Sequence, residues 1–253
     1  MKIYVVSIED EKSQRLQKFL SQSFFQDNDF VFSQVGIKGV DLPTKQYFEQ
    51  AVKGRAKPLT PGELGCSLSH LKALDLFLAT EDEYALILED DAILPENFSY
   101  QNLKRELIRL ELPKNIIFSL GGIQMKECRK TRGIILEKNI LGHKILKVIP
   151  DFYHRVNYTV SYVVDRAMAK TLINYHKPIR KADDWSFLFD FDSTAHIFMS
   201  FIVDHPVIES GEISQQLSSI EAERAGHCEI RKSKYGTAIR KNIAKFLSRT
   251  YPI

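Results

Sequence analysis

The sequence contains few cysteines: Cys66, Cys128 and Cys228 are the three among 253 residues, and they stand far apart. This spacing argues against a disulfide framework and offers no closely spaced pair of zinc ligands. A run of about 18 uncharged apolar residues is also missing, which argues against a membrane-spanning helix. We therefore expect a cytoplasmic protein that is soluble or bound peripherally to a membrane.

Neither sign of charge is in large excess: 35 basic residues nearly balance 32 acidic ones and leave a net charge of +3. So small an excess does not indicate a nucleic-acid partner, and the sequence has no glycine-rich phosphate loop ending in Lys-Ser or Lys-Thr. Hydrophobic residues make up 44% of the chain, enough for one sizeable core at this length.

Patterns typical of strands and helices alternate along most of the chain. We expect strands over 3–8, 30–35, 84–88, 116–120, 158–164 and 197–203, and helices over 10–24, 61–79, 98–110, 167–175 and around 184–188. Residues 133–148 are expected to form a hairpin or an irregular insert around Gly142. The alternation predicts one α/β domain over residues 1–225, in which helices flank a mostly parallel central sheet.

The predicted strand Tyr84–Leu88 is followed directly by Glu89, Asp90 and Asp91. Like charges about 4 Å apart repel by about 4 kcal/mol at a dielectric of about 20, so three crowded acids attract a cation. Ligands of open α/β sheets bind at the carboxyl ends of strands, and carboxylate oxygens suit Mg²⁺ or Mn²⁺. The other interpretation is that these acids begin a solvated loop.

The tail, residues 226–253, differs in character because cations and apolar residues are interleaved in it. Ile239, Ile243, Phe246 and Leu247 recur at helical spacing. One interpretation is a basic amphipathic helix that binds an anionic membrane surface. The other is a terminal helix that packs its apolar stripe on the core, which is the commoner use of such a stripe.

Two sequence blocks resemble a known family. Leu59–His70 has the sequence Leu-Thr-Pro-Gly-Glu-Leu-Gly-Cys-Ser-Leu-Ser-His, and Ala85–Ala92 has the sequence Ala-Leu-Ile-Leu-Glu-Asp-Asp-Ala. In order and spacing these blocks resemble glycosyltransferase family 25 of bacterial lipopolysaccharide and lipooligosaccharide biosynthesis. The segments Tyr158–Ala169 and Pro178–Trp185 are more loosely similar to it, so that the resemblance covers most of residues 1–210.

The resemblance implies a fold of the GT-A type and an inverting glycosyltransferase that uses a UDP-sugar, typically UDP-galactose, with Mn²⁺ or Mg²⁺. It also implies an oligosaccharide acceptor of lipooligosaccharide or lipopolysaccharide. The family carries an Asp-x-Asp-like motif on the strand end that holds Glu89, Asp90 and Asp91. The resemblance and the crowding of acids therefore agree on a cation at this position.

Three residues are candidate metal ligands. Asp91 is the first choice, and Glu89 is a second carboxylate at the same strand end. His205, which follows the last predicted strand, is a further candidate, although imidazole suits Mn²⁺ less well than carboxylate does.

The candidates for binding the nucleotide sugar are Ser7, Arg15, His70, Glu89 and Asp90. Arg15 offers a planar fork for a phosphate, and a solvated arginine on a helix face is an equal interpretation. Glu89 and Asp90 would hydrogen-bond the ribose or the donor sugar. His70 belongs to the block that resembles the family, whereas a lone helical histidine is more often a structural residue.

Inverting transfer requires a carboxylate that accepts the proton of the acceptor hydroxyl. Asp184 is the candidate base and Asp183 the reserve, while either residue equally suits the N-terminal cap of a helix. Two other functions fit acids at a strand end: a nucleotidyltransferase, or a binding module that holds a structural metal.

Overall fold

The computed structural model of the protein describes residues 1–26, 30–206 and 238–252. The strands are β1 (Lys2–Val6), β2 (Phe32–Val35), β3 (Tyr84–Glu89), β4 (Ile116–Gly121), β5 (Arg132–Ile135), β6 (Leu146–Val148), β7 (Ser161–Asp165), β8 (His196–Val203) and β9 (Arg249–Thr250). The longer helices are α1 (Gln14–Leu20), α3 (Pro61–Leu78), α4 (Tyr100–Leu110), α5 (Arg166–Tyr175) and α8 (Ala238–Phe246). The shorter ones are α2 (Thr44–Tyr47), α6 (Leu188–Phe191), η1 (Ser23–Gln26), η2 (Gly39–Asp41), η3 (Phe48–Val52) and η4 (Pro150–Arg155).

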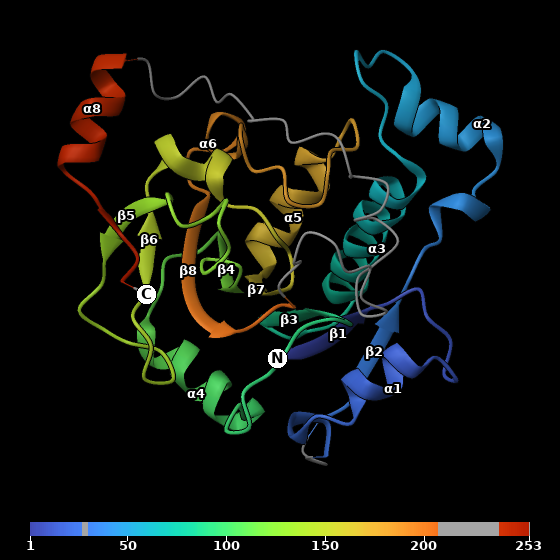
Figure 1. The fold of residues 1–253 in the computed structure, drawn as a ribbon, viewed down its shortest axis with the longest axis horizontal. Coiled ribbons are helices and arrows are strands. Elements are labelled where there is room, and N and C mark those ends of the chain that lie inside the picture. Colours follow the sequence, from blue (N-terminus) through green and yellow to red (C-terminus); the bar gives the residue numbers. More distant parts are fainter. Residues whose placement is uncertain (27–29, 207–237, 253) are drawn as a thin grey trace.

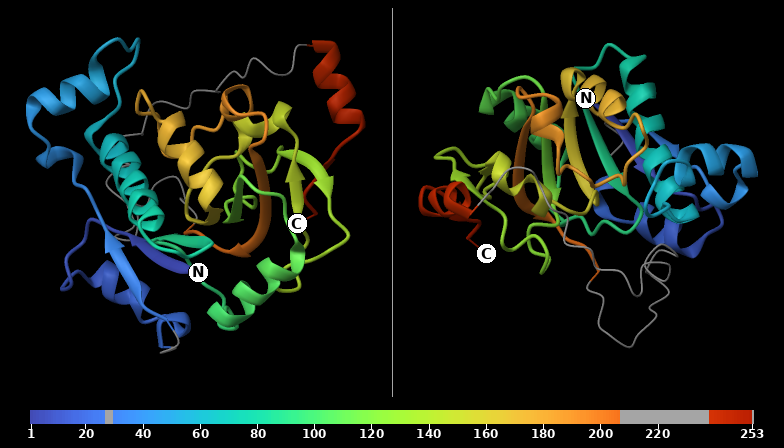
Figure 2. Two further views of the ribbon diagram at one scale, coloured as in Figure 1. Left: turned by 180° about the vertical axis from the view of Figure 1, so that it is seen from behind. Right: turned by 90° about the horizontal axis from the view of Figure 1, so that it is seen from above.

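These strands form one sheet in the order β2-β1-β3-β7-β4-β8-β6-β5-β9, with helices on both faces. Helices α3 and α5 lie on one face and α1 and α4 on the other, while α2 and α8 stand at opposite ends of the molecule (Figures 1 and 2). The prediction of an α/β domain is confirmed.

The prediction of a mostly parallel sheet is wrong. The pairs β1–β2, β1–β3 and β4–β8 are parallel, whereas β3–β7, β4–β7, β5–β6, β5–β9 and β6–β8 are antiparallel. Two of these antiparallel pairs involve β7, which runs between β3 and β4 and is buried along its whole length, and the other three join β5, β6, β8 and β9. A strand that is buried on both faces is apolar in either direction, so the sequence pattern does not reveal its direction.

Side chains of each strand alternate between two hydrophobic clusters. In β1, Ile3 and Val5 belong to the cluster with α1 and α4, whereas Tyr4 and Val6 belong to the one with α3 and α5. Full burial of one such side chain stabilises the fold by about 1.5–3 kcal/mol. The two clusters therefore hold the helices against both faces and fix the strand ends between them.

Helix α3 begins as the sequence predicts. The Thr60 side chain accepts a hydrogen bond from the Glu63 N–H, the Glu63 side chain accepts one from the Thr60 N–H, and Pro61 occupies the first turn. The helix also lies very close to η2: a Cβ on Gly39 would be 1.8 Å from the carbonyl oxygen of Pro61. A Cβ on Gly65 would be 2.6 Å from the carbonyl oxygen of Ile37, so both contacts require glycine.

Two local predictions have opposite outcomes. The segment 133–148 contains the antiparallel pair β5–β6, so its hairpin is confirmed. The prediction of a helix around 184–188 is wrong, because residues 184–187 are not helical and the short helix α6 begins at Leu188. The Asp184 side chain accepts a hydrogen bond from the Ser186 N–H (3.3 Å), a local bond that competes with helix formation.

The described part of the tail contains the predicted helix, α8. The apolar stripe of this tail does not pack on the core. Ile239, Ile243, Phe246 and Leu247 are 78%, 55%, 89% and 72% exposed, so the interpretation that they pack on the core is wrong. Strand β9 pairs with β5 and joins the tail to the sheet. The predicted boundary at residues 225 and 226 lies outside the described residues. Within these, no helix has both the length and the apolar character needed to cross a membrane.

Candidate functional site

The candidate site lies at the carboxyl ends of the parallel strands β1 and β3. Val6 stands opposite Glu89 in the register, so that Ser7 follows one strand where Asp90 and Asp91 follow the other. The next segment reaches β8 through a bridge between Ile93 and Asp204, which brings His205 to the same place. The sheet thus gathers residues from three distant parts of the chain.

Asp90 and Asp91 share one cation, Arg15 of α1. The Arg15 guanidinium donates to Asp90 Oδ1 from Nε at 2.8 Å and from Nη2 at 2.5 Å, and Nη2 lies 3.1 Å from Asp91 Oδ2. The Ser7 hydroxyl donates to Asp90 Oδ2 at 2.5 Å. Burial raises the pKa of Asp90, and Arg15 and Ser7 oppose this effect. The cation that the sequence leads us to expect beside these acids is therefore, in part, a side chain of the protein.

The Asp91 side chain is 9% exposed and pairs with His205. His205 Nε2 lies 3.6 Å from Asp91 Oδ2, and His205 Nδ1 lies 2.8 Å from the carbonyl oxygen of Pro206. Burial alone would raise the pKa of Asp91, but the charges of His205 and Arg15 outweigh it and lower this pKa. The other carboxylate oxygen, Oδ1, has no hydrogen-bond partner within the described part of the chain. A buried carboxylate oxygen of this kind fits one contact to a divalent cation.

Glu89 lies at the centre of an adjacent group. Its Oε1 accepts a hydrogen bond from Thr159 Oγ1 at 2.5 Å and lies 3.1 Å from His70 Nε2. His70 Nδ1 lies 2.9 Å from the Tyr162 hydroxyl. The side chain of Glu89 is 23% exposed, so it remains open to a ligand.

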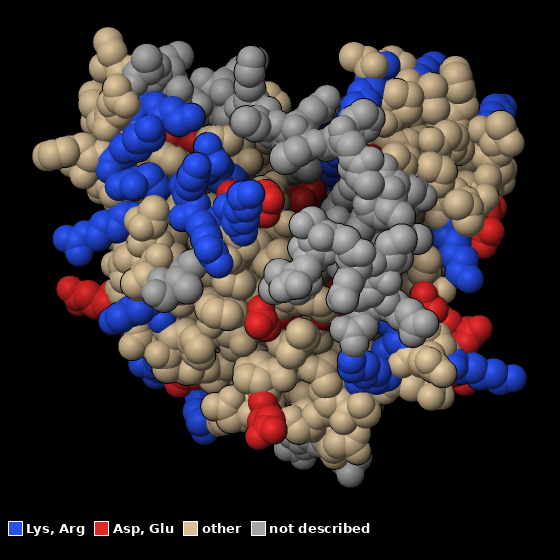
Figure 3. All heavy atoms as spheres, viewed as in Figure 1, with Lys and Arg blue, Asp and Glu red and all other residues tan. Residues whose placement is uncertain are grey.

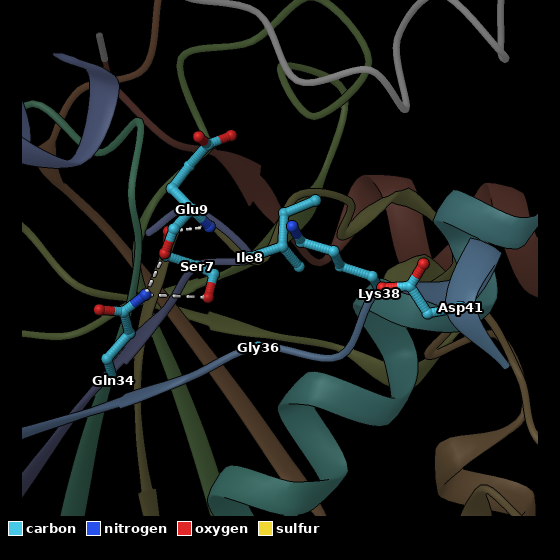
Figure 4. Close-up of a pocket in the computed structure, with 7 residues that line it drawn as sticks. All are labelled: Ser7, Ile8, Glu9, Gln34, Gly36, Lys38 and Asp41. Carbon is cyan, nitrogen blue, oxygen red and sulfur yellow. Dashed lines mark hydrogen bonds between the residues drawn. The ribbon is translucent and has the colours of Figure 1, made fainter. Parts of the chain in front are cut away.

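A hollow of about 430 Å³ opens at the carboxyl ends of β1 and β2 (Figure 4). Figure 4 shows Glu9 and Gln34 on one side of it and Lys38 and Asp41 on the other. The Gln34 amide donates to the Glu9 carbonyl oxygen at 2.6 Å. Because Ser7 belongs to both the hollow and the Asp90 contacts, the two features are continuous.

The candidate bases lie in the turns between α5 and α6. Asp183 Oδ2 accepts a hydrogen bond from the Tyr158 N–H at 3.3 Å, next to the Thr159 that contacts Glu89. Asp184 accepts from Ser186 in its own turn, which resembles the cap that the sequence also allows. The contacts therefore connect Asp183 to the Glu89 group through neighbouring residues.

Sequence analysis did not identify Thr159, Tyr162 or Cys66 as site residues. Thr159 and Tyr162 reach Glu89 and His70 because β7 runs antiparallel to β3, with Ile87 opposite Tyr162. No sequence pattern specifies that register. The sequence does contain a pattern that could have identified Cys66: it stands four residues before His70, and residues at this spacing share one face of a helix.

Comparison with known proteins identifies the family of the chain. A family model described as "Glycosyltransferase family 25 (LPS biosynthesis protein)" matches residues 1–187. The chain belongs to glycosyltransferase family 25. As a member of this family of lipopolysaccharide biosynthesis, it is a glycosyltransferase, for which a nucleotide-sugar donor and an oligosaccharide acceptor are the family's substrates.

Other comparisons add little to the family match. No curated protein matches the chain. A solved structure titled "Crystal Structure of A197 from STIV" is similar at 15% identity and a TM-score of 0.39, over 82% of this chain and 87% of that one. A likeness of this extent carries no argument about function.

Proposed function

We propose that the protein is a metal-dependent, inverting glycosyltransferase of the GT-A type that transfers galactose from UDP-galactose to an oligosaccharide of lipooligosaccharide or lipopolysaccharide. The observation that carries the proposal is the buried oxygen of Asp91, which has no hydrogen-bond partner within the described residues. Asp91 directly follows Asp90, whose carboxylate accepts a hydrogen bond from the hollow-lining Ser7. Family membership supports the reaction class, and the sugar, the metal and the stereochemistry are parts of the proposal.

The hollow at the ends of β1 and β2 is the proposed nucleoside site. Its volume lies within the usual range for small-ligand pockets, and its polar side chains offer hydrogen-bond partners. Arg15 is already engaged by both aspartates, which supports a role in holding Asp90 and Asp91 rather than a role limited to a phosphate contact.

Asp91 and Glu89 are the proposed ligands for Mn²⁺ or Mg²⁺, with His205 as a third. The ion would offset the negative charge that develops on the departing diphosphate. The contact of His205 Nδ1 with the Pro206 carbonyl leaves Nε2 facing Asp91, an orientation that suits a ligand.

Asp184 remains the candidate base, with Asp183 as the alternative. Either carboxylate would accept the proton of the acceptor hydroxyl. The contact between Asp183 and the Tyr158 N–H supports Asp183, because it connects this residue to the Glu89 group. Comparing Asp183→Asn with Asp184→Asn separates them: the variant that loses turnover but retains donor binding identifies the base.

The test of the proposed function measures UDP release from a panel of UDP-sugars, with Mn²⁺ or Mg²⁺ and a lipooligosaccharide acceptor. UDP-galactose should be the best donor, and Asp91→Asn should lose most of the activity while remaining folded. Asp75→Asn, at an exposed position of α3, is the matched control and should retain activity. Full activity of Asp91→Asn would refute the proposed metal role.

The same preparations decide between the alternatives. Release of pyrophosphate from a nucleoside triphosphate would instead support a nucleotidyltransferase. Stabilisation by metal without turnover of any donor would support a binding module.

We also propose that α8 binds an anionic membrane surface and holds the enzyme at the cytoplasmic face where a lipid-linked acceptor lies. Its three large apolar side chains and Leu247, which follows it, are exposed. Residues 238–252 carry four cations, Arg240, Lys241, Lys245 and Arg249, and no acidic residue. Lys and Arg also gather over the neighbouring β5 and β6 (Figure 3). A surface with both features fits an anionic bilayer.

The described contacts hold this surface in place. The Arg132 guanidinium donates to the Lys245 carbonyl oxygen at 2.7 Å, and Arg240 lies 3.4 Å from Asp151. The Phe201 N–H donates to the hydroxyl of Tyr251, which is itself 9% exposed. The apolar face of α8 is therefore exposed on a helix that is fastened to the sheet at its C-terminal end.

A further inference from the structure

A second group of potential ligands lies beside the acids of the candidate site. Cys66 and His70 are four residues apart in α3 and so share one face of the helix, while Glu89 ends β3 opposite that face. The Cys66 sulfur, one ring nitrogen of His70 and one oxygen of Glu89 all lie within 4.8 Å of one another. Two rigid elements thus bring a sulfur, a nitrogen and an oxygen together.

The orientation of His70 is the second observation that points to a ligand. Its Nδ1 lies 2.9 Å from the hydroxyl of the buried Tyr162, and its Nε2 faces Glu89 at 3.1 Å. Metal-bound histidines commonly use their other ring nitrogen for such a hydrogen bond, which fixes the tautomer and the ring.

The donor set decides which cation suits the position. Thiolate, imidazole and carboxylate are the ligand types of Zn²⁺, whereas Mg²⁺ and Mn²⁺ prefer oxygen. Zinc sites with three protein ligands keep a fourth position open. We propose that Cys66, His70 and Glu89 form a binding site for one zinc-class divalent cation, separate from the oxygen ligand offered by Asp91.

A consequence of this site rests on the proposed function. Glu89 is also a candidate ligand of the catalytic metal and a contact of the donor, so a zinc ion that holds it would remove it from that role. Zinc should therefore inhibit UDP release, and Cys66→Ala should relieve the inhibition.

The direct test uses the reduced full-length protein and Co²⁺ as a spectroscopic substitute for Zn²⁺. We expect a thiolate-to-cobalt charge-transfer absorption that saturates at one equivalent and disappears when Zn²⁺ is added. Cys66→Ala and His70→Gln should abolish or greatly weaken this absorption. Cys228→Ser, which changes a cysteine outside the described residues, is the matched control and should retain it.

The outcomes are distinct from those of the transferase assay, because the absorption does not depend on turnover. A folded wild-type protein that gives no thiolate absorption overturns the site, as does an absorption that depends on Cys228 instead of Cys66. In that case His70 and Glu89 are joined by a hydrogen bond alone. Circular dichroism of each variant shows that its loss is not a loss of folding.

Discussion

Arg15 is the residue that compensates the charge of the two aspartates, Asp90 and Asp91. Its side chain is 16% exposed, and one guanidinium faces Asp90 and Asp91 at hydrogen-bond distance. Without this charge the two carboxylates would repel each other in a poorly solvated place. The sequence led us to treat Arg15 as either a phosphate ligand or a solvated residue, whereas the structure places it within the acidic cluster.

Replacing Arg15 by alanine should therefore reduce stability strongly. Removing one partner of a buried ion pair costs about 3–5 kcal/mol, because the remaining charge is left uncompensated. Urea unfolding of Arg15→Ala and of Arg105→Ala, an exposed arginine of α4, measures the difference. Equal stability of the two variants would show that Arg15 does not compensate the aspartates.

A partly buried histidine, His154, should make the protein less stable in acid. Burial, with the charges of Arg155 and Lys241, lowers the pKa of His154 from 6.5 to about 4. The unfolded chain gains a proton at this position below about pH 6.5 and the folded protein only near pH 4, so stability is lost as the pH falls through this window. His176 is buried, and this burial with the charge of Arg180 lowers its pKa to about 4 as well.

The measurement compares free energies of unfolding of the wild type and His154→Gln across this pH range. The variant should show a weaker dependence on pH, because it lacks one group that binds a proton on unfolding. His143→Gln, at an exposed position, should follow the wild type. An unchanged slope in His154→Gln would contradict the lowered pKa.

Among the elements, α3 shows what the sequence could predict about the fold, and β7 shows what it could not. The start of α3 was predictable because Thr60, Pro61 and Glu63 form a local capping pattern. The direction of β7 was not, because its residues are buried on both faces. The same limit applies to the site: adjacent acids can be found in the sequence, but Thr159 and Tyr162 reach them only through the pairing of β7 with β3.

Helix α8 should lose membrane affinity when its apolar face is made acidic. Phe246 is 89% exposed, so Phe246→Glu should leave the fold intact. Full burial of such a side chain is worth about 1.5–3 kcal/mol, which predicts a loss of at least about tenfold in binding to anionic vesicles. Vesicle sedimentation with phosphatidylglycerol measures this loss.

The matched control is Ile108→Glu, on α4, where the isoleucine is 59% exposed. It should bind vesicles as the wild type does. Equal binding by both variants would exclude α8 as the membrane surface and favour a protein partner for this helix.

For the molecule as a whole, the family model agrees with the resemblance read from the sequence, and the structure agrees with the expected α/β architecture. The mixed sheet departs from the mostly parallel one that the sequence predicts. The residues that the sequence marks near the ends of β1 and β3, which are Ser7, Arg15, Asp90 and Asp91, do come together. Their chemical roles stay predictions, because adjacency does not establish a reaction.

Binding of the donor should be visible as a gain in the stability of the whole protein. A ligand that binds only the native state adds about 2.7 kcal/mol at a free concentration of about 100 times its Kd. We expect UDP-galactose with Mn²⁺ to raise the melting temperature more than UDP-glucose or Mn²⁺ alone does. Asp91→Asn should lose the metal-dependent part of this gain, and an undiminished gain would place the metal elsewhere.

The close approach of α3 to η2 gives two glycines an influence that extends beyond their own position. A methyl group on Gly39 or Gly65 would meet backbone atoms, which cannot move aside as a flexible side chain can. The least disruptive response to the added methyl group is a displacement of the whole helix α3. Because Cys66 and His70 belong to α3, they would move with it. An inactive Gly65→Ala enzyme would thus retain every reactive group and lack only their alignment.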